Sequence, residues 1–308
     1  MTRDLPSEAR RWTCPVCGSD RTSPWKRENV ITDLSPDHFR ITDATYGQTL
    51  PLVRCEDCGF GFADPPYMAD LVSYYERLTD DQYIDTQDTR TMQMQRIVEK
   101  ARKFAPGAET ALDVGAGVGA LVNECRQAGL EAVGIEPSRA FAETAKQLYD
   151  VDLISDVLPS QQLTGRTFDI VFLVDVIEHV GDPVALLGYC RDLLSPSGVL
   201  VVVTPDAQSL ATRLLRFGWW HFRVAHVGYF NRRAFGIAAQ RAKLEILRTE
   251  RAKWYFEGTY LAERLTRYPL LAPFAKLLLG SGLGRRLLRV TIPLNLFDSH
   301  LFFLRIAR

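Results

Sequence analysis

The stretch Leu-Asp-Val-Gly-Ala-Gly-Val-Gly at residues 112–119 has the composition of a ligand-binding turn. It follows the apolar run Thr110–Leu112 and precedes a helical pattern that begins at Ala120. Glycine has no Cβ and tolerates positive φ, so such a turn lets backbone approach a ligand closely. The turn carries one acid and three glycines: Asp113, Gly115, Gly117 and Gly119. Its spacing is not that of a dinucleotide fingerprint, and the Gly-Lys-Ser/Thr of a P-loop is absent.

Further carboxylates stand at the ends of the next apolar runs. Glu136 closes the predicted strand Glu131–Ile135, 17 residues after Gly119. A carboxylate there can accept hydrogen bonds from both ribose hydroxyls of a nucleoside. A short predicted strand at Val151–Ile154 is followed by Asp156. The turn and these acids together favour a nucleoside-containing ligand.

Alternating strand and helix signals give the elements that must position these groups. Near-continuous Val/Ile/Leu runs at 168–175 and 198–206 are typical of parallel strands buried on both faces, and they predict a doubly wound α/β fold. Residues 243–254 and 300–307 provide two further predicted strands.

Over residues 106–255 this order of motifs resembles the class I S-adenosylmethionine (SAM) methyltransferases. The resemblance implies a Rossmann-like seven-stranded sheet with helices on both faces, spanning 106–308. It also implies that SAM is the cofactor and that Asp156 faces the adenine amino group. The cofactor-binding set it implies is Asp113, Gly115, Gly117, Gly119, Glu136, Asp156, Val174 and Asp175.

Two Cys-x-x-Cys-Gly pairs near the start of the chain indicate a metal site. Their thiolates are Cys14, Cys17, Cys55 and Cys58, the set that closes a tetrahedral structural Zn²⁺ site. A redox role is the rival interpretation, but neither pair starts a predicted helix. We therefore predict a zinc ribbon over 1–66, with a β-hairpin or meander at Asn29–Thr32 and His38–Thr42. Cys125 and Cys190 lie on apolar helix faces and are expected to be core residues.

The sequence Asp64-Pro-Pro-Tyr67 is similar to the signature of methyltransferases that act on amino groups. It precedes the glycine-rich turn rather than following the fourth strand, so we interpret it as a rigid linker. Residues 67–105 read as a helical cofactor lid or linker. Tyr75 and Tyr83 are candidates to line the pocket or, alternatively, to pack as ordinary aromatics.

Methyl transfer to an oxygen needs a base, and histidine suits because its ordinary pKa is about 6.5. Among five histidines, His179 and His226 are the catalytic candidates, each with simple packing as the alternative. Asp175, Glu178 and His179 are spaced to share one face of a helical turn. The stretch 175–180 is similar to ubiquinone-biosynthesis O-methyltransferases, which implies Mg²⁺ as an alternative cofactor.

The segment His226-Val-Gly-Tyr-Phe-Asn231 resembles a stretch of methyltransferases from sugar and polysaccharide pathways. Sugar C-methyltransferases share it and a front zinc module, but they carry a further C-terminal domain for which this sequence has no room. The resemblance therefore implies transfer to an oxygen of a sugar or glycan precursor. The alternatives are a phenolic or lipid hydroxyl, a sugar carbon, RNA, or a non-enzymatic scaffold whose zinc module binds a partner.

A helical insertion is predicted at 256–299, before the last strand. Within 258–297 there are six basic residues and one acid, among many leucines. Such a segment can lie in a membrane interface, where a lipid-linked glycan would be the acceptor, or it can pack on the core or at a dimer interface.

The totals describe an ordinary globular protein: 308 residues, 46% hydrophobic, with 37 basic and 37 acidic residues. Zero net charge gives nucleic-acid binding no support. Neither a signal peptide nor an apolar run of about 18 residues is seen, so we expect a cytoplasmic protein, with peripheral contact at the inner face of the membrane as a variant. The oligomeric state stays open.

Overall fold

The structure, a computed structural model, describes residues 12–30, 33–42, 45–65, 68, 71–80, 83, 87–266 and 268–307. Predictions that concern residues 1–11, Ile31 and Thr32, Pro66 and Tyr67, or Arg267 lie outside these residues.

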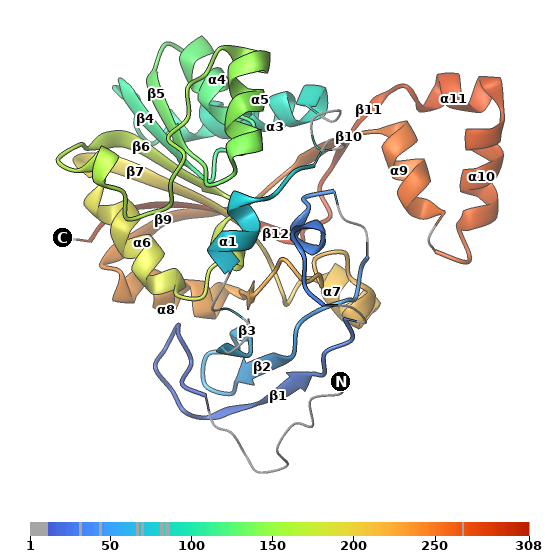
Figure 1. The fold of residues 1–308 in the computed structure, drawn as a ribbon, viewed down its shortest axis with the longest axis horizontal. Coiled ribbons are helices and arrows are strands. Elements are labelled where there is room, and N and C mark those ends of the chain that lie inside the picture. Colours follow the sequence, from blue (N-terminus) through green and yellow to red (C-terminus); the bar gives the residue numbers. More distant parts are fainter. Residues whose placement is uncertain are drawn as a thin grey trace.

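A mixed six-stranded sheet forms the centre of the molecule (Figure 1). In spatial order its strands are β5 (Glu131–Ile135), β4 (Thr110–Val114), β6 (Phe168–Val174), β7 (Leu194–Pro205), β12 (Ser299–Ile306) and β9 (Leu244–Arg251). The first four are parallel, and β12 runs antiparallel between β7 and β9. The predicted α/β fold with a central sheet is confirmed. Where a seventh strand was expected at 151–154, only the single bridge Ile154–Ile135 forms.

Alternate side chains of the strands enter two separate cores, as the period of two along a strand requires. On one face α3 (Gln87–Ala101) and α4 (Ala120–Gln127) cover the sheet, and Phe303 of β12 stacks on Phe104 at 4.3 Å. On the other face lie α6 (Pro183–Asp192) and α8 (Arg232–Arg241), and Phe302 stacks on Phe235 at 3.7 Å. The helix α5 (Arg139–Tyr149) joins the α3 side through Ala145. The sheet therefore has a hydrophobic core on each of its two faces.

The chain reverses its direction of travel at β4, which lies between β5 and β6. In open α/β sheets, ligands bind at the carboxyl ends of the strands at such a switch point. Beyond these ends lie α1 (Leu71–Glu76), the 3₁₀ turn Ile177–His179 and the segment that contains α7 (Leu210–Leu215). The fold thus brings the glycine-rich turn and both candidate histidines to one edge.

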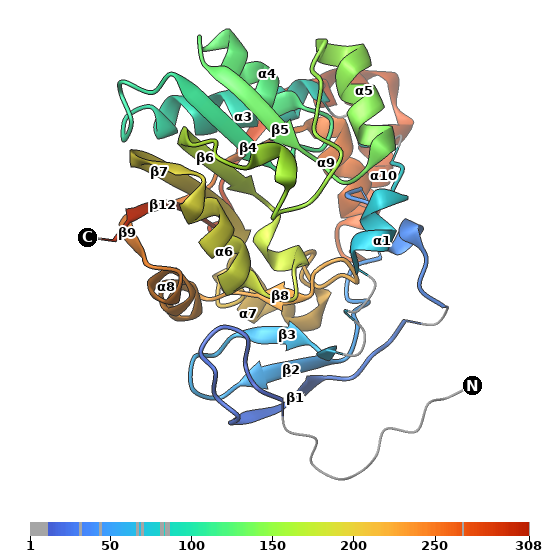
Figure 2. The same ribbon diagram turned by 60° about the vertical axis from the view of Figure 1, so that its left-hand side comes forward.

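A second, antiparallel sheet contains the cysteine region (Figure 2). Its order is β1 (Thr22–Lys26), β2 (Leu52–Cys55), β3 (Gly61–Ala63) and β8 (Gly228–Tyr229). The predicted hairpin at Asn29–Thr32 and His38–Thr42 was wrong in its described part, where Pro36–Phe39 is a 3₁₀ helix and no strand forms. The pattern of β1 was missed because it contains Pro24. Proline is tolerated here since β1 is an edge strand with a register shift next to it.

The predicted insertion projects from the body as an arm (Figure 1). The strands β10 (Trp254–Glu257) and β11 (Thr291–Leu294) pair as its two-stranded stalk. Three short helices lie between these two strands: α9 (Gly258–Leu265), α10 (Ala272–Gly280) and α11 (Gly282–Leu288). Among the described residues, no helix has the length and apolar character needed to span a membrane.

Candidate functional site

A cavity of about 780 Å³ opens at the carboxyl edge of the parallel strands. Its wall includes the glycine-rich turn, the end of β5, the 3₁₀ turn at 177–179, and residues from α1, α3 and the root of the arm. Cavities of several hundred Å³ hold cofactor-sized ligands. The predicted cofactor-binding residues and the two candidate catalytic histidines therefore border the same cavity. We call these two parts of its wall the cofactor side and the histidine side.

The glycine-rich turn has the conformation that its sequence predicts. Gly115, Gly117 and Gly119 have φ of +75°, +54° and +80°, a region in which side chains are rarely accommodated. A Cβ on Gly115 would lie 2.5 Å from Val176 Cγ2, and one on Gly117 would lie 2.8 Å from the hydroxyl of Tyr83. The turn is therefore a backbone surface that only glycine can form, and Gly115 and Gly117 both border the cavity.

Glu136 and Asp113 are buried carboxyl groups beside this turn. Glu136 accepts hydrogen bonds from the backbone N–H of Gly117 and Ser138, each at 2.9 Å. Burial raises the pKa of Glu136 to about 7 despite these two donors. Burial, with the nearby Glu136, raises the pKa of Asp113 to about 8. Burial therefore makes the ionised form of both carboxyl groups costly in free energy. A ligand with hydroxyl or cationic groups would offset this cost by binding to the carboxylates.

The other predicted cofactor residues, Asp156, Val174 and Asp175, also border the cavity. Asp156 accepts a hydrogen bond from the N–H of Val157 at 2.8 Å. Asp175 has a φ of +54°, and its buried Oδ1 has no hydrogen-bond partner. Burial raises the pKa of Asp175 to about 7. A strained residue with an unsatisfied carboxyl oxygen at a cavity wall is typical of a binding position.

His179 and His226 lie side by side, with ring centroids 4.7 Å apart and planes at 88°. The Nδ1 of His179 is 2.8 Å from the carbonyl oxygen of Ala225 and 2.6 Å from the hydroxyl of Tyr75. Because a carbonyl oxygen can only accept, Nδ1 carries the proton and Nε2 keeps its lone pair. Burial, helped by the charge of Arg223, lowers the pKa of His179 to about 3. The ring is therefore held neutral in one orientation.

Glu178 joins the two histidines in a group whose ligand atoms lie within 4.8 Å of one another. Its Oε2 accepts a hydrogen bond from Thr204 at 3.1 Å, whereas its buried Oε1 has no partner. Asp175 does not belong to this group, because its positive φ takes it out of the 3₁₀ turn that carries Glu178 and His179. The predicted alignment of Asp175 with Glu178 and His179 on one helical face was therefore wrong.

Sequence reasoning missed three groups in this cavity: Arg90, His221 and Arg223. His221 stacks on His226 at 5.5 Å, which makes a cluster of three imidazoles. Arg223 donates to the backbone oxygens of Ile41 and Arg40 and so joins this loop to the cysteine-containing half of the chain. No pattern marks His221 and Arg223, because a loop sets their places, and the period of α3 does not show that Arg90 borders the cavity.

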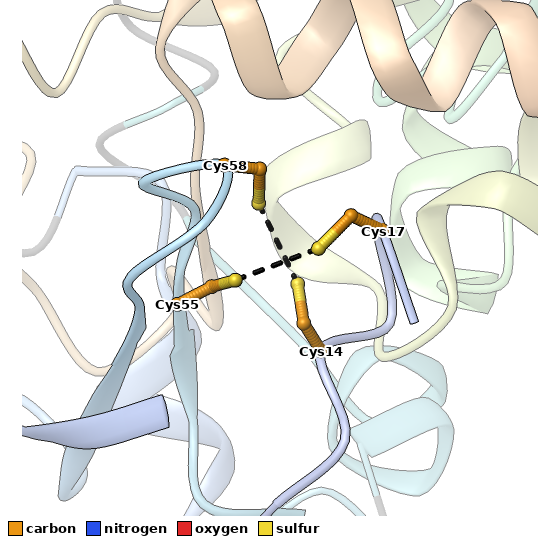
Figure 3. Close-up of side chains that lie close together, drawn as sticks. All are labelled: Cys14, Cys17, Cys55 and Cys58. Atoms are coloured by element: carbon orange, nitrogen blue, oxygen red, sulfur yellow. Dashed lines mark hydrogen bonds between the residues drawn. The ribbon is translucent and has the colours of Figure 1, made fainter. Parts of the chain in front are cut away.

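The four predicted zinc ligands converge (Figure 3). The sulfurs of Cys14 and Cys58 are 3.7 Å apart, and those of Cys17 and Cys55 are 3.5 Å apart. Four thiolates at about 2.3 Å from Zn²⁺ would be separated by about 3.8 Å in a tetrahedron, so the spacing fits the ion. The glycine after each pair, Gly18 and Gly59, has a positive φ. In each knuckle this glycine donates to the carbonyl of the first cysteine, so both have the same turn.

The cysteine region is hydrogen-bonded to the histidine side of the cavity. β3 pairs with β8, which starts two residues after His226. Between them, the N–H of Ala63 donates to Val227, and the N–H of Val227 donates to the carbonyl of Glu178. Asn231, which caps α8, donates to the carbonyl of Cys58. The sheet that carries the cysteines therefore also holds the histidine loops.

A family described as a methyltransferase domain matches residues 87–249, which is more than half of the chain. Over this range the glycine-rich turn, the end of β5 and both strands β6 and β7 are included. The Cys-x-x-Cys pairs and the arm lie outside it.

Curated relatives include proteins named ubiquinone biosynthesis O-methyltransferase. The one from Rhodopseudomonas palustris strain TIE-1 is 33% identical over 38% of this chain and 44% of its own length. The one from Cereibacter sphaeroides strain ATCC 17029 is 32% identical over 35% of this chain and 47% of its own length. The chain thus spans less than half the length of these relatives.

Solved structures with a similar fold include a SAM-dependent methyltransferase from Clostridium acetobutylicum ATCC 824. It covers 70% of this chain and 92% of its own, at 10% identity and a TM-score of 0.48. The PH0226 protein from Pyrococcus horikoshii OT3 covers 78% of this chain and 95% of its own, at 16% identity and the same TM-score of 0.48.

Proposed function

The chain belongs to the methyltransferase-domain family, and on this premise we propose that it transfers the methyl group of SAM to a hydroxyl oxygen. The observation that carries the proposal is a single cavity bordered on one side by the glycine-rich turn and Glu136, and on the other by His179 and His226. An oxygen acceptor needs both a methyl donor and a proton acceptor, and the cavity offers places for both.

The residues of the cofactor side fit a nucleoside with a charged tail. Gly115 and Gly117 border the cavity with their backbone, so a ligand can lie against the turn. Gly119 does not border the cavity, and a Cβ there would meet Ala145 and Val151. Glu136 is the acceptor for the ribose hydroxyls, and Asp156 faces the base. Asp113, Val174 and Asp175 also border the cavity and would contact the rest of the ligand. Bound SAM supplies the methyl group on a sulfonium, and the residues supply alignment.

The histidine side would handle the acceptor proton. The fixed Nδ1–H of His179 leaves Nε2 as the proton acceptor, and Tyr75 and the carbonyl of Ala225 hold the ring in place. His226, packed edge-to-face on His179, is the second candidate. Both groups stay neutral over the physiological range, because burial lowers their pKa. A neutral imidazole can accept a proton as the C–O bond forms.

For the acceptor we propose a sugar or glycan precursor. Aromatic side chains that suit sugar faces border the histidine side of the cavity, among them Tyr75 and Trp220. The second candidate is a phenolic or lipid hydroxyl, which the names of the Rhodopseudomonas and Cereibacter relatives favour.

A divalent ion is an alternative for the histidine side. Glu178, His179 and His226 could hold it, and the unpartnered Oε1 of Glu178 supports such a role. One carboxylate with two imidazoles suits a transition metal better than Mg²⁺, which prefers oxygen ligands. This ion would be distinct from the structural Zn²⁺ that we assign to the four cysteines.

The test is calorimetric titration of SAM into the zinc-loaded protein, with Glu136→Ala as the disabling variant and Glu131→Ala, exposed at the start of the same strand, as the control. Binding that is lost in Glu136→Ala alone supports the cofactor assignment. Methyl transfer from labelled SAM is then measured with glycosides, lipid-linked glycans and phenols, with and without added Mg²⁺. A folded protein that binds no SAM would overturn the enzymatic proposal and favour a scaffold that binds partners through its zinc module.

A further inference from the structure

The arm carries an exposed apolar surface that the body does not cover. We call it the arm surface and define it by eight side chains of 270–290: Leu270, Leu271, Phe274, Leu277, Leu278, Leu283, Leu287 and Val290. Leu270 is 89% exposed, and Phe274, Leu277 and Leu283 are each more than 70% exposed. Single exposed leucines are common, but a concentration of large apolar groups on one appendage marks an interaction site.

The helices of the arm are arranged so that this surface stays open. α10 and α11 pack on each other and on α9, and the strands β10 and β11 join them to the body (Figure 1). Arg264 of α9 also donates to the carbonyl oxygen of Thr42. Only Ala275 of α10 and Gly284 of α11 are buried, so the helices contact each other through small residues and direct their large ones outward.

Charge identifies the occupant of this surface. Residues 268–297 contain four basic side chains, Lys276, Arg285, Arg286 and Arg289, and no acidic one. Two copies of the arm would bring like charges together, which disfavours self-association through it. An anionic membrane combines the two properties that the surface needs, an apolar layer and negative headgroups.

The lengths of the helices agree with a position in the interface. α10 has 9 residues and α11 has 7, whereas a transmembrane helix needs about 20. Short helices with leucines and arginines bury their apolar groups only to the depth of the headgroup boundary. We propose that the arm surface docks the protein on a membrane that contains anionic phospholipid.

Docking would bring the cavity close to the lipid. Arg264, Arg289 and Leu294, at the root of the arm, border the cavity as well as the stalk. If the protein is the methyltransferase proposed above, its acceptor is membrane-borne, with its hydroxyl entering from the arm side. This step rests on the proposed function, whereas docking itself does not.

The experiment is flotation of the whole 308-residue chain, loaded with zinc, with vesicles of phosphatidylcholine alone and of phosphatidylcholine with phosphatidylglycerol. We expect flotation with the anionic vesicles only, and weaker flotation at high salt. Each basic side chain near such a surface contributes about 1 kcal/mol, so Arg285→Glu/Arg286→Glu should weaken binding by about tenfold or more. Leu277→Asp should weaken binding at any salt concentration.

Matched controls come from the body. Arg232→Glu/Arg233→Glu reverses a similar exposed pair on α8, and Leu148→Asp alters an exposed leucine on α5; both should float like the unaltered protein. SAM affinity, measured on every variant, shows that each is folded and separates failure of docking from failure of the proposed function. Absence of flotation with anionic vesicles, equal losses in the controls, or a dimer that Leu277→Asp dissociates without any vesicle binding would overturn the proposal.

Discussion

At the scale of single residues, the site is a set of ionisable groups that the fold removes from water. Asp113, Glu136 and Asp175 have raised pKa values because of burial, and His179, His221 and His226 have lowered ones for the same reason. Burial acts against charge in both cases, so the cavity favours the neutral form of all six groups. Binding of a ligand must change the protonation of these groups, and the pH dependence of binding measures that change.

We expect SAM affinity to fall as the pH drops below about 7, because the ribose hydroxyls need an ionised Glu136. The pKa of Glu136 in the free protein is about 7. Below it, binding must first release a proton, which costs up to about tenfold in affinity per pH unit. Calorimetry from about pH 5 to about pH 9 measures this slope.

Glu136→Gln should flatten part of this dependence, and Glu131→Gln, exposed on the same strand, should leave it unchanged. Asp113, whose pKa is raised to about 8 by burial and by the nearby Glu136, contributes a further rise in affinity at higher pH, and this rise should move to lower pH in Glu136→Gln. A wild-type affinity that is constant across the whole range would contradict the assignment of Glu136.

His179→Ala should lower kcat by about 10²- to 10⁴-fold, the usual contribution of a general base, and leave SAM affinity intact. Because its pKa is lowered to about 3, the imidazole remains unprotonated as the pH falls through 6.5. The acid limb of kcat should therefore lie well below the usual histidine range. An acid limb near 6.5 would show that another group acts as the base.

Tyr75→Phe tests positioning by the hydroxyl that lies 2.6 Å from the Nδ1 of His179. We expect a smaller fall in kcat than in His179→Ala, together with a shifted acid limb that a purely structural role would not produce. Tyr189→Phe, at a half-exposed tyrosine of α6, is the matched control. An unchanged pH profile in Tyr75→Phe would show that the ring orientation does not depend on this contact.

At the scale of elements, sequence predicted whatever has a period or a fixed spacing. The strands β6, β7 and β12 were visible because their apolar runs are buried on both faces, and the turn at 115–119 because three glycines need positive φ. The four cysteines were visible for the same reason, since each pair is followed by a left-handed glycine. The strand β1, with Pro24, was missed, and the strand predicted at Val151–Ile154 is only a single bridge at Ile154, because tertiary pairing decides both.

Gly117→Ala should destabilise the protein and impair SAM binding. A left-handed alanine costs about 1–2 kcal/mol, and its Cβ would also press on the hydroxyl of Tyr83, 2.8 Å away. Gly107→Ala is the control, because a Cβ there meets nothing within 4 Å. Thermal melts and SAM titrations of both variants measure the difference, and equal behaviour of the two would show that the turn tolerates a side chain.

Removal of Zn²⁺ should affect the histidine side more than the cofactor side. β3 pairs with β8 next to His226, whereas the glycine-rich turn is joined to β5 and α4. We expect chelation, or Cys58→Ser, to lower the melting temperature and abolish turnover while SAM binding persists in the cold. Cys125→Ala, at a buried cysteine outside the cluster, should keep one zinc per chain by elemental analysis. Full turnover by metal-free protein would refute this coupling.

At the scale of the whole molecule, the pairing of the two stalk strands allows the arm to be removed without a break in the rest of the chain. Glu257 and Thr291 face each other in the antiparallel pair of β10 and β11, so a two-residue Asn-Gly turn can replace residues 258–290. We expect this shortened protein to fold and to bind SAM as before, since the sheet and the turn keep their contacts. It should no longer float with anionic vesicles. Loss of SAM binding in the shortened protein would show that the arm is part of the cofactor pocket.

The acceptor, by contrast, could not be predicted at any of these scales from the sequence. The groups that surround the histidines, such as His221 and Arg223, come from a loop whose path depends on contacts with Ile41 and Arg40, far away in the chain. Spacing along one element carries no information about such long-range neighbours.

The pairing of β3 with β8 also sets an order on synthesis. Both cysteine pairs leave the ribosome early and can bind their ion, but Gly61 has no partner on that side until Tyr229 has been made. During this interval the nascent chain presents an open sheet edge, to which another growing chain could add. The strand that completes the sheet, β8, is only two residues long and lies late in the chain, so the edge of β3 is covered late in synthesis. The risk should therefore fall with rapid synthesis of the residues between Ala63 and Gly228, or with a chaperone that covers β3 during this interval.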